Sequence, residues 1–334
     1  TDGKGCIARD TVRVTINARP TVAPSATPAT VCNGASSTIA ANATGGTTPY
    51  TYTWTPAGSG ASHSQSPVST TNYGVTVSDA NSCTASGTVT LNVTGTSPLT
   101  ANAGAARTIC SGATTNLGGS PTASGGSGGF TYAWSSTPAG FTNTTANPTA
   151  SPTATTTYTV TVTSSGCTAT SSVVVTVNPR PSVAPSATPA AICNGQSSTI
   201  AANATGGTAP LTYTWSPNGA GASHTQTPSA TTSYSVTVTD ANMCTAAGSV
   251  TVNVTGTSPL VANAGAARTI CNGTSTTLGG TPTGSGGTGT YTYAWSGGAG
   301  TTANPVVTPT ATTTYTVTVT SSTCTVSSTV IVTV

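Results

Sequence analysis

The nine cysteines are the residues whose type and spacing point most clearly to chemistry in this 334-residue chain. Zinc binding would require paired ligands a few residues apart, and the sequence contains no Cys-x-x-Cys motif. After Cys6, neighbouring cysteines form pairs, and each pair encloses one tryptophan and one Thr-rich or Ser-rich segment. We therefore predict one disulfide within each of four domains: Cys32–Cys83, Cys110–Cys167, Cys193–Cys244 and Cys271–Cys324.

These disulfides would each join the entry of an early strand to the start of the last strand, at one end of a domain. A closed loop of about 50 residues stabilises the folded state by roughly 4 kcal/mol in the chain-entropy treatment. Disulfides also indicate an oxidising compartment outside the cytoplasm. Cys6 is left over, and its partner is expected in an upstream domain or in another molecule.

His63 and His224 are the two histidines, and they stand in the equivalent segments ASHSQ and ASHTQ. A neighbouring serine could serve as a nucleophile with histidine as its base, but adjacent residues on a strand point to opposite faces. No carboxylate lies nearby in the sequence to orient the imidazole. We interpret both as surface or packing residues and predict no enzyme activity, no cofactor and no metal site.

Charged residues make up only 3% of the chain, and the net charge is +3. Nucleic-acid binding needs a clustered basic stripe, which this sequence lacks. No apolar run reaches the roughly 18 residues of a membrane helix, so no membrane span is predicted. Asp79 and Asp240 stand in Asp-Ala-Asn segments, where the carboxylate is expected to cap its own turn.

Two glycine-rich runs, residues 125–129 and 284–289, invite comparison with phosphate-binding loops. Both lack the lysine and the following helix that a phosphate loop needs. We interpret them as flexible hairpin connections.

Apolar and polar residues alternate strictly in segments 155–165, 231–240 and 312–322, which is the period of half-buried β-strands. Short strands with turn signals about every ten residues predict an all-β chain, a tandem array of immunoglobulin-like antiparallel β-sandwiches with one disulfide each. The four tryptophans each end an alternating segment and mark one core per domain. In the first sandwich the expected core residues are Trp54, Tyr73, Val75, Val77, Val89, Leu91 and Val93.

Internal repetition divides the chain into domains of two alternating types, with a period of about 160 residues. The predicted domains are domain 1 (20–95, type 1), domain 2 (96–179, type 2), domain 3 (180–256, type 1) and domain 4 (257–334, type 2). Residues 1–19 repeat the final strand of a type 2 domain, so we expect them to end a truncated upstream domain. The alternative is that residues 1–17 dock as a free strand on a neighbouring subunit.

The motif ANAGAARTIC, followed by LGG, YAW and PTATTTYTVTVTSS, resembles the tandem Ig-like or PKD-like repeats of Bacteroidota cell-surface and secreted proteins. The segments GGTTPYTYTW and YGVTVSDANSCTASGTVTLNV are similar to the gliding-adhesin repeats of that group. The resemblance covers essentially the whole chain. It implies type IX export and an extracellular or cell-surface location, in stalks, adhesins or filaments. Such repeats usually carry more acidic turn residues, so a borrowed calcium-binding role is not supported.

Several residues fit glycosylation motifs. Asp10-Thr11-Val12 resembles the acidic O-glycosylation motif of Bacteroidota proteins, and N-x-S/T sequons occur at six asparagines. The candidate sites are Thr11, Asn42, Asn92, Asn143, Asn203, Asn253 and Asn272.

Two functions fit these observations. The first is a non-enzymatic structural protein that forms an extracellular filament, sheath or stalk through end-to-end and lateral contacts between copies of itself. Near-identical repeats and a nearly uncharged surface favour this function, since little electrostatic repulsion opposes packing. The alternative is a cell-surface adhesin whose repeats bind glycans or surfaces, or extend a binding tip.

Overall fold

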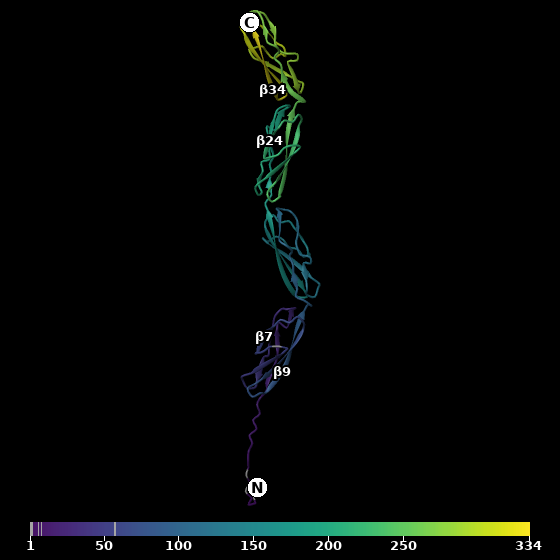
Figure 1. Cartoon of the computed structure of the whole chain (residues 1–334), viewed down its shortest axis with the longest axis vertical. Coiled ribbons are helices and arrows are strands. Elements are labelled where there is room, and N and C mark those ends of the chain that lie inside the picture. The colour runs from purple at the N-terminus through teal and green to yellow at the C-terminus, as the bar shows by residue number, and fades with distance from the viewer. Residues whose placement is uncertain (1–2, 6, 8, 57) are drawn as a thin grey trace. The chain divides into compact units, whose positions relative to one another are not determined.

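The computed structural model describes residues 3–5, 7, 9–56 and 58–334, and Figure 1 labels some of its strands. The chain forms two compact units, residues 1–177 and 178–334. The first unit contains domain 1 and residues 96–177 of domain 2, and the second begins at Asn178 and contains domains 3 and 4. The regular elements of the described residues are β-strands, so the predicted all-β class is confirmed. None of these residues forms a helix long and apolar enough to cross a membrane.

Domain 1 combines a four-stranded sheet, β3-β9-β8-β6, with a three-stranded sheet, β2-β4-β7, and a β1-β5 pair. Its strands are β1 (Pro20–Val22), β2 (Ser25–Thr27), β3 (Thr30–Cys32), β4 (Ser37–Ala40), β5 (Ala43–Gly45), β6 (Thr51–Thr55), β7 (Ser62–Gln65), β8 (Thr71–Ser78) and β9 (Thr84–Thr94).

Domain 2 has the four-stranded sheet β11-β17-β16-β14 and the pairs β10-β13 and β12-β15. Its strands are β10 (Thr100–Ala101), β11 (Arg107–Cys110), β12 (Thr115–Asn116), β13 (Ala123–Ser124), β14 (Thr131–Thr137), β15 (Thr149–Ala150), β16 (Thr156–Ser164) and β17 (Cys167–Asn178).

Domain 3 repeats the arrangement of domain 1, with the sheets β20-β26-β25-β23 and β19-β21-β24 and a β18-β22 pair. Its strands are β18 (Pro181–Ser182), β19 (Ser186–Thr188), β20 (Ala191–Cys193), β21 (Ser198–Ala201), β22 (Thr205–Gly206), β23 (Thr212–Ser216), β24 (Ser223–Gln226), β25 (Thr232–Thr239) and β26 (Thr245–Thr255).

Domain 4 repeats the arrangement of domain 2, with the sheet β28-β34-β33-β31 and the pairs β27-β30 and β29-β32. Its strands are β27 (Ser258–Ala262), β28 (Arg268–Thr269), β29 (Thr276–Thr277), β30 (Gly284–Gly287), β31 (Thr292–Trp295), β32 (Val306–Val307), β33 (Thr313–Ser321) and β34 (Cys324–Thr333).

The largest sheet has the same strand order in all four domains. The last strand of the domain lies between a short early strand and the long strand that precedes it, as β9 lies between β3 and β8. The short strand runs parallel to the last strand in domains 1, 3 and 4. The long strands pair antiparallel with each other. This order defines an immunoglobulin-like sandwich.

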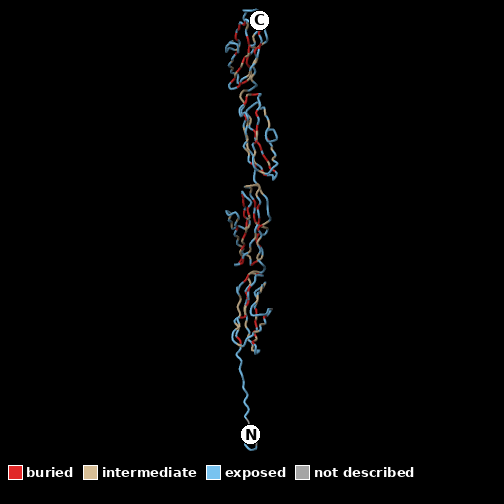
Figure 2. The backbone as a smooth tube through the Cα atoms, turned by 90° about the vertical axis from the view of Figure 1, so that its left-hand side faces the viewer, coloured by how far each residue is buried: buried red, intermediate tan, exposed pale blue. Residues whose placement is uncertain are grey.

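Each sandwich encloses one core around its tryptophan, and Figure 2 shows buried residues, in red, along the strands of every domain. The predicted inner face of domain 1 is confirmed, because its residues are either buried or packed against the buried cluster. They are Trp54, Tyr73, Val75, Val77 and Leu91, which are buried, and Val89 and Val93, which pack against them. Because side chains alternate along a strand, Thr76 of β8 and Thr88 and Thr90 of β9 face outward and are exposed.

The predicted pairing of Cys32 with Cys83 is wrong, because these residues lie at opposite ends of domain 1. Parallel register places Cys32 beside Thr94, the last residue of β9, whereas Cys83 immediately precedes Thr84, the first residue of β9. The 11 residues of β9 span roughly 35 Å. A disulfide needs Cα atoms within about 7 Å of each other.

Residues 9–19 contain no strand, although their sequence repeats that of β17. Val12 and Val14 are 85% and 79% exposed, whereas the equivalent residues of domain 2, Val173 and Val175, are buried. Whether residues 1–19 close an upstream domain stays a prediction, as do the domain bounds. Cys6 lies outside the described residues.

Candidate functional site

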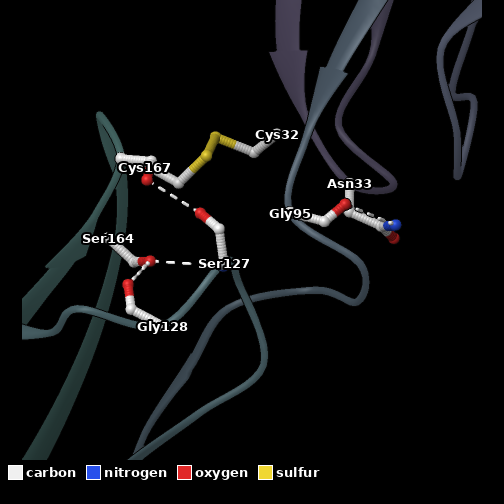
Figure 3. Close-up of a disulfide and its surroundings, with 8 residues drawn as sticks. Cys32, Asn33, Gly95, Ser127, Gly128, Ser164 and Cys167 are labelled. Atoms are coloured by element: carbon white, nitrogen blue, oxygen red, sulfur yellow. Dashed lines mark hydrogen bonds between the residues drawn. A yellow bond between two sulfur atoms is a disulfide. The ribbon is translucent and has the colours of Figure 1, made fainter.

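The junction between domains 1 and 2 is held by a disulfide that passes from one domain to the next (Figure 3). Cys32, the last residue of β3, bonds to Cys167, the first residue of β17, and their Cα atoms are 5.7 Å apart. The sequence separation is 135 residues. In the chain-entropy treatment a loop of this length stabilises the folded state by about 5 kcal/mol.

Two local features bring these cysteines together. The parallel pairing of β3 with β9 places Cys32 beside Thr94, where the chain leaves domain 1. In domain 2, Ser165 and Gly166 form the turn between β16 and β17, with φ values of 48° and 84°. This left-handed turn, which favours glycine, starts β17 with Cys167 at the junction.

Asn33 fixes the end of domain 1 next to the disulfide. It is 7% exposed, its Nδ2 donates to the Val68 carbonyl at 2.6 Å, and its backbone N–H donates to the Thr94 carbonyl at 3.0 Å. A longer Nδ2 contact, of 3.5 Å, reaches the carbonyl of Gly95 (Figure 3). The buried amide therefore ties the first linker residue to the strand that carries Cys32.

The linker after domain 1 folds back on the glycine-rich loop of domain 2. The Thr96 N–H donates to the Gly126 carbonyl at 3.1 Å, and the Gly126 N–H donates to the Ser97 carbonyl at 2.9 Å. Gly125 has a φ of 75°, and a Cβ there would lie 1.9 Å from the Pro98 carbonyl oxygen. Only glycine fits this close approach.

Serine side chains fasten the other side of this loop. The Ser127 Oγ donates to the Ser165 Oγ at 2.8 Å. The Ser164 Oγ donates to the Gly128 carbonyl at 2.6 Å, as Figure 3 shows. Run 125–129 is therefore a bonded part of the junction rather than a flexible hairpin connection. The glycine-rich composition of the run could not reveal these hydrogen bonds, because the bonding partners come from the linker before domain 2 and from the β16–β17 turn.

The junction between domains 3 and 4, within the second unit, repeats this arrangement. Cys193 bonds to Cys324 with a Cα–Cα distance of 5.7 Å and a sequence separation of 131 residues. The Asn194 Nδ2 donates to the Ser229 carbonyl at 2.7 Å, and the Thr257 N–H donates to the Gly287 carbonyl at 3.0 Å. A Cβ added at Gly286 would lie 1.9 Å from the Pro259 carbonyl oxygen, as at Gly125. The repeated sequence therefore gives the same junction geometry in both units.

The other predicted intradomain disulfides are also wrong, since Cys167 bonds to Cys32 and Cys324 bonds to Cys193. Cys110 and Cys244 are disulfide-bonded, whereas Cys83 and Cys271 are free thiols. Pairing neighbours along the sequence assumed that both cysteines of a domain meet at one end. No sequence signal revealed that the short strand runs parallel to the last strand, which puts them at opposite ends.

Asp79 caps the turn before β9, as predicted, and also holds the loop before β6. Its Oδ1 accepts hydrogen bonds from the backbone N–H groups of Asn81 (2.9 Å) and Cys83 (2.8 Å), and its Oδ2 accepts one from Thr47 (3.0 Å). The hydrogen bond from the Thr47 N–H has the largest influence on the pKa of this carboxyl and lowers it. Burial raises the pKa, and the bonds from the Cys83 and Asn81 N–H groups lower it further. The net pKa lies below its usual value of 3.8.

Asp240 has the same role in domain 3. Burial is the largest influence and raises the pKa of Asp240, but the backbone donors of Thr208, Cys244 and Asn242 outweigh it. The net pKa of this carboxyl is therefore also lowered.

We expect Asp79→Asn to lower the melting temperature of domain 1 near neutral pH and to flatten its dependence on acid. A carboxyl whose pKa is lower in the folded state stabilises it fully above the unfolded pKa, near 3.8. That stabilisation is lost as pH falls from about 5 through the folded pKa, so the wild type should lose stability in this window. Melting curves between pH 3 and 7 test this, with the exposed Asp10→Asn as the matched control; equal pH profiles for Asp79→Asn and wild type would contradict it.

The two histidines pack edge-on against core tryptophans, in agreement with their interpretation as packing residues. The ring centroids are 5.2 Å apart for His63 and Trp54 and 5.3 Å apart for His224 and Trp215, with interplanar angles of 78°. The His224 Nε2 also lies 3.1 Å from the Asn218 carbonyl. Within the described residues, no group of three His, Cys, Asp or Glu side chains could hold a metal ion.

Two sequon asparagines have side chains engaged by the fold. The Asn42 Nδ2 donates to the Ala23 carbonyl (3.0 Å) and to the Ser25 Oγ (2.9 Å), and Asn203 makes the equivalent bonds in domain 3. Asn143 is half-buried, and its Oδ1 accepts from the Thr145 N–H. The other candidate sites, Thr11, Asn92, Asn253 and Asn272, are exposed. Glycosylation stays a prediction at all of them.

The sheet order and the disulfides define the class of protein: an array of about four immunoglobulin-like sandwiches with disulfides that link their strands. Two segments of the chain, residues 25–59 and 190–220, match the SprB repeat, a gliding-adhesin repeat of Bacteroidetes. They lie at equivalent places in domains 1 and 3, which confirms the resemblance to adhesin repeats. SprB repeats together with disulfides indicate a cell-surface protein.

Comparison with curated proteins gave no match to this chain. Among solved structures, the eight N-terminal Ig domains of Down syndrome cell adhesion molecule are 14% identical with a TM-score of 0.42. That match covers 93% of this chain and 49% of the other, so the chain spans about half of that array. The titin I-band fragment I67–I69 is 12% identical over 72% of this chain and 99% of the fragment, with a TM-score of 0.35.

The insect immune protein hemolin is 12% identical over 94% of this chain and 99% of hemolin, with a TM-score of 0.26. These identities and scores are low, and the fold assignment depends on the strand order of this chain itself.

Proposed function

We propose that this chain is a tension-carrying segment of an extracellular cell-surface adhesin and has no enzymatic activity of its own. The observation that carries the proposal is the disulfide that passes from one domain to the next in each unit. Tension applied along the chain passes from Cys32 directly to Cys167 and bypasses the residues between them. The sequence favoured a filament, but the SprB matches support an adhesin instead.

The outer faces of the large sheets support a hydroxyl-rich binding partner. Thr76 pairs with Ser86 across neighbouring strands at an oxygen–oxygen distance of 3.0 Å, and Thr159 pairs with Ser172 at 2.8 Å. These exposed hydroxyls bind water or other hydroxyls without charge. We infer that the repeats contact neutral glycans or similarly polar surfaces.

A flow-chamber assay tests the adhesin function. Beads coated with the oxidised chain should stay on polysaccharide-coated glass at shear that removes beads coated with an inert, equally charged protein. Addition of a reductant should lower retention several-fold, because tension then unfolds the sandwiches. Retention no higher than that of the inert protein would contradict the proposal.

A filament built from copies of this chain is the second candidate, and the repetition of the junction geometry in both units favours it. Electron microscopy of native, unreduced material separates the two. Ordered fibres with an axial repeat of two domains indicate the filament, and isolated rods indicate the adhesin.

A further inference from the structure

Cys83 and Cys271 are free thiols at positions where the repeat elsewhere carries bonded cysteines. Cys83 is the second cysteine of a type 1 domain, and its equivalent in domain 3, Cys244, is disulfide-bonded and fully buried. Cys271 is the first cysteine of a type 2 domain, and its equivalent in domain 2, Cys110, is also disulfide-bonded. The sequence around each position is therefore compatible with a disulfide.

The local backbone presents the free and the bonded cysteines in the same way. The Cys83 N–H donates to Asp79 Oδ1 at 2.8 Å, and the Cys244 N–H donates to Asp240 Oδ1 at 2.8 Å. At the other position, the Cys271 carbonyl accepts from the Thr274 N–H at 3.0 Å, as the Cys110 carbonyl accepts from the Ala113 N–H at 2.9 Å. The free cysteines thus have the same local backbone hydrogen bonds as the disulfide-bonded cysteines at the equivalent positions.

The two disulfides that join Cys32 to Cys167 and Cys193 to Cys324 follow one rule. The first cysteine of a domain bonds to the second cysteine of the next domain. By this rule Cys83 requires the first cysteine of a domain before domain 1, and Cys271 requires the second cysteine of a domain after domain 4. Neither partner lies within residues 20–334.

The segment before domain 1 supports a type 2 domain at that place. Its sequence repeats the closing strand β17, yet Val12, Val14 and Ile16 are 85%, 79% and 90% exposed. These three exposed apolar side chains stand at alternate positions, so they would share one face of the segment if it paired with a sheet as β17 does.

We propose that Cys83 and Cys271 are the open ends of a disulfide ladder that continues into adjoining Ig-like domains. Cys83 bonds to the first cysteine of a preceding type 2 domain, and Cys271 bonds to the second cysteine of a following type 1 domain. The junctions before domain 1 and after domain 4 are then closed by a disulfide, as are the junctions between domains 1 and 2 and between domains 3 and 4.

Each bond forms by thiol–disulfide exchange with a disulfide oxidant. One thiolate attacks the oxidant and forms a mixed disulfide, and the partner thiolate then displaces the oxidant. The two cysteines lose two electrons and two protons, and the oxidant leaves as two thiols. Oxidised glutathione supplies this chemistry in vitro and leaves as two molecules of glutathione.

An extended chain tests the ladder. A second copy of residues 178–256 is added after Val334, which supplies a type 1 domain in the alternating order. Cys6→Ser is introduced in the chain and Cys193→Ser in the added copy, so that the thiols expected without the new bond are Cys83, Cys271 and the added Cys244. After oxidation with glutathione, the extended chain should show one reactive thiol instead of three, and peptide mapping should join Cys271 to the added Cys244.

The matched control carries Cys244→Ser in the added copy and should keep two reactive thiols, with the same circular dichroism spectrum. A Cys271 that remains open to alkylation in the extended chain would overturn the proposal. A bond from Cys271 to another molecule at high protein concentration, with the added Cys244 left free, would overturn it equally.

Discussion

Stretched between its two ends, the oxidised protein should not release the chain length held in residues 33–166 and 194–323. Cys32–Cys167 and Cys193–Cys324 span 135 and 131 residues, and tension takes these covalent routes. At about 3.4 Å per extended residue, each enclosed segment holds on the order of 45 nm. Reduction should make both lengths available, so single-molecule force spectroscopy should record successive unfolding of the sandwiches only with a reductant.

A double variant, Cys32→Ser with Cys193→Ser, provides an internal check on this result. It should extend further than the native oxidised chain even without a reductant, because neither the Cys32–Cys167 nor the Cys193–Cys324 disulfide can form. The pairing seen in the structure would be refuted if the oxidised native chain unfolded one sandwich after another. Such a record would fit the intradomain disulfides that neighbour pairing predicts, with each loop confined to about 50 residues.

Leu91→Ala should destabilise domain 1 by about 2–5 kcal/mol. Leu91 is fully buried on β9 and belongs to the cluster around Trp54. Its removal leaves a cavity in a core whose domain is expected to have roughly 5–15 kcal/mol of total stability. Urea titration followed by hydrogen exchange of peptides from domain 1 measures the loss and separates it from the other domains.

Two variants in the same domain serve as controls for Leu91→Ala. Leu91→Val should cost less than about 1.5 kcal/mol, because domain 3 carries the buried Val252 at the equivalent position. Val68→Ala should change stability by no more than about 0.5 kcal/mol, since Val68 is 68% exposed. A loss as large for Leu91→Val as for Leu91→Ala would show that shape at this site, rather than the cavity, governs stability.

The strands and the core were readable from local sequence. Alternation in the segment of β8 assigns Tyr73, Val75 and Val77 to one face, because side-chain direction on a strand depends only on position along it. The core position of the tryptophans and the capping role of the Asp-Ala-Asn turns could also be predicted, because the residues they contact lie within one domain. Repetition then extended each assignment from domain 1 to domain 3 and from domain 2 to domain 4.

The junction was decided only by the tertiary structure. The sequence predicted eight bonded cysteines, of which Cys83 and Cys271 are free, and paired them all within domains. It showed neither that β3 runs parallel to β9 nor that the length of β9 separates Cys32 from Cys83. It also assigned run 125–129 to flexible connections, although that run receives the linker of the preceding domain. Local periodicity determines which residues are strands and which face inward. The relative direction of strands distant in sequence, and hence which cysteines meet, depends on packing that no short segment encodes.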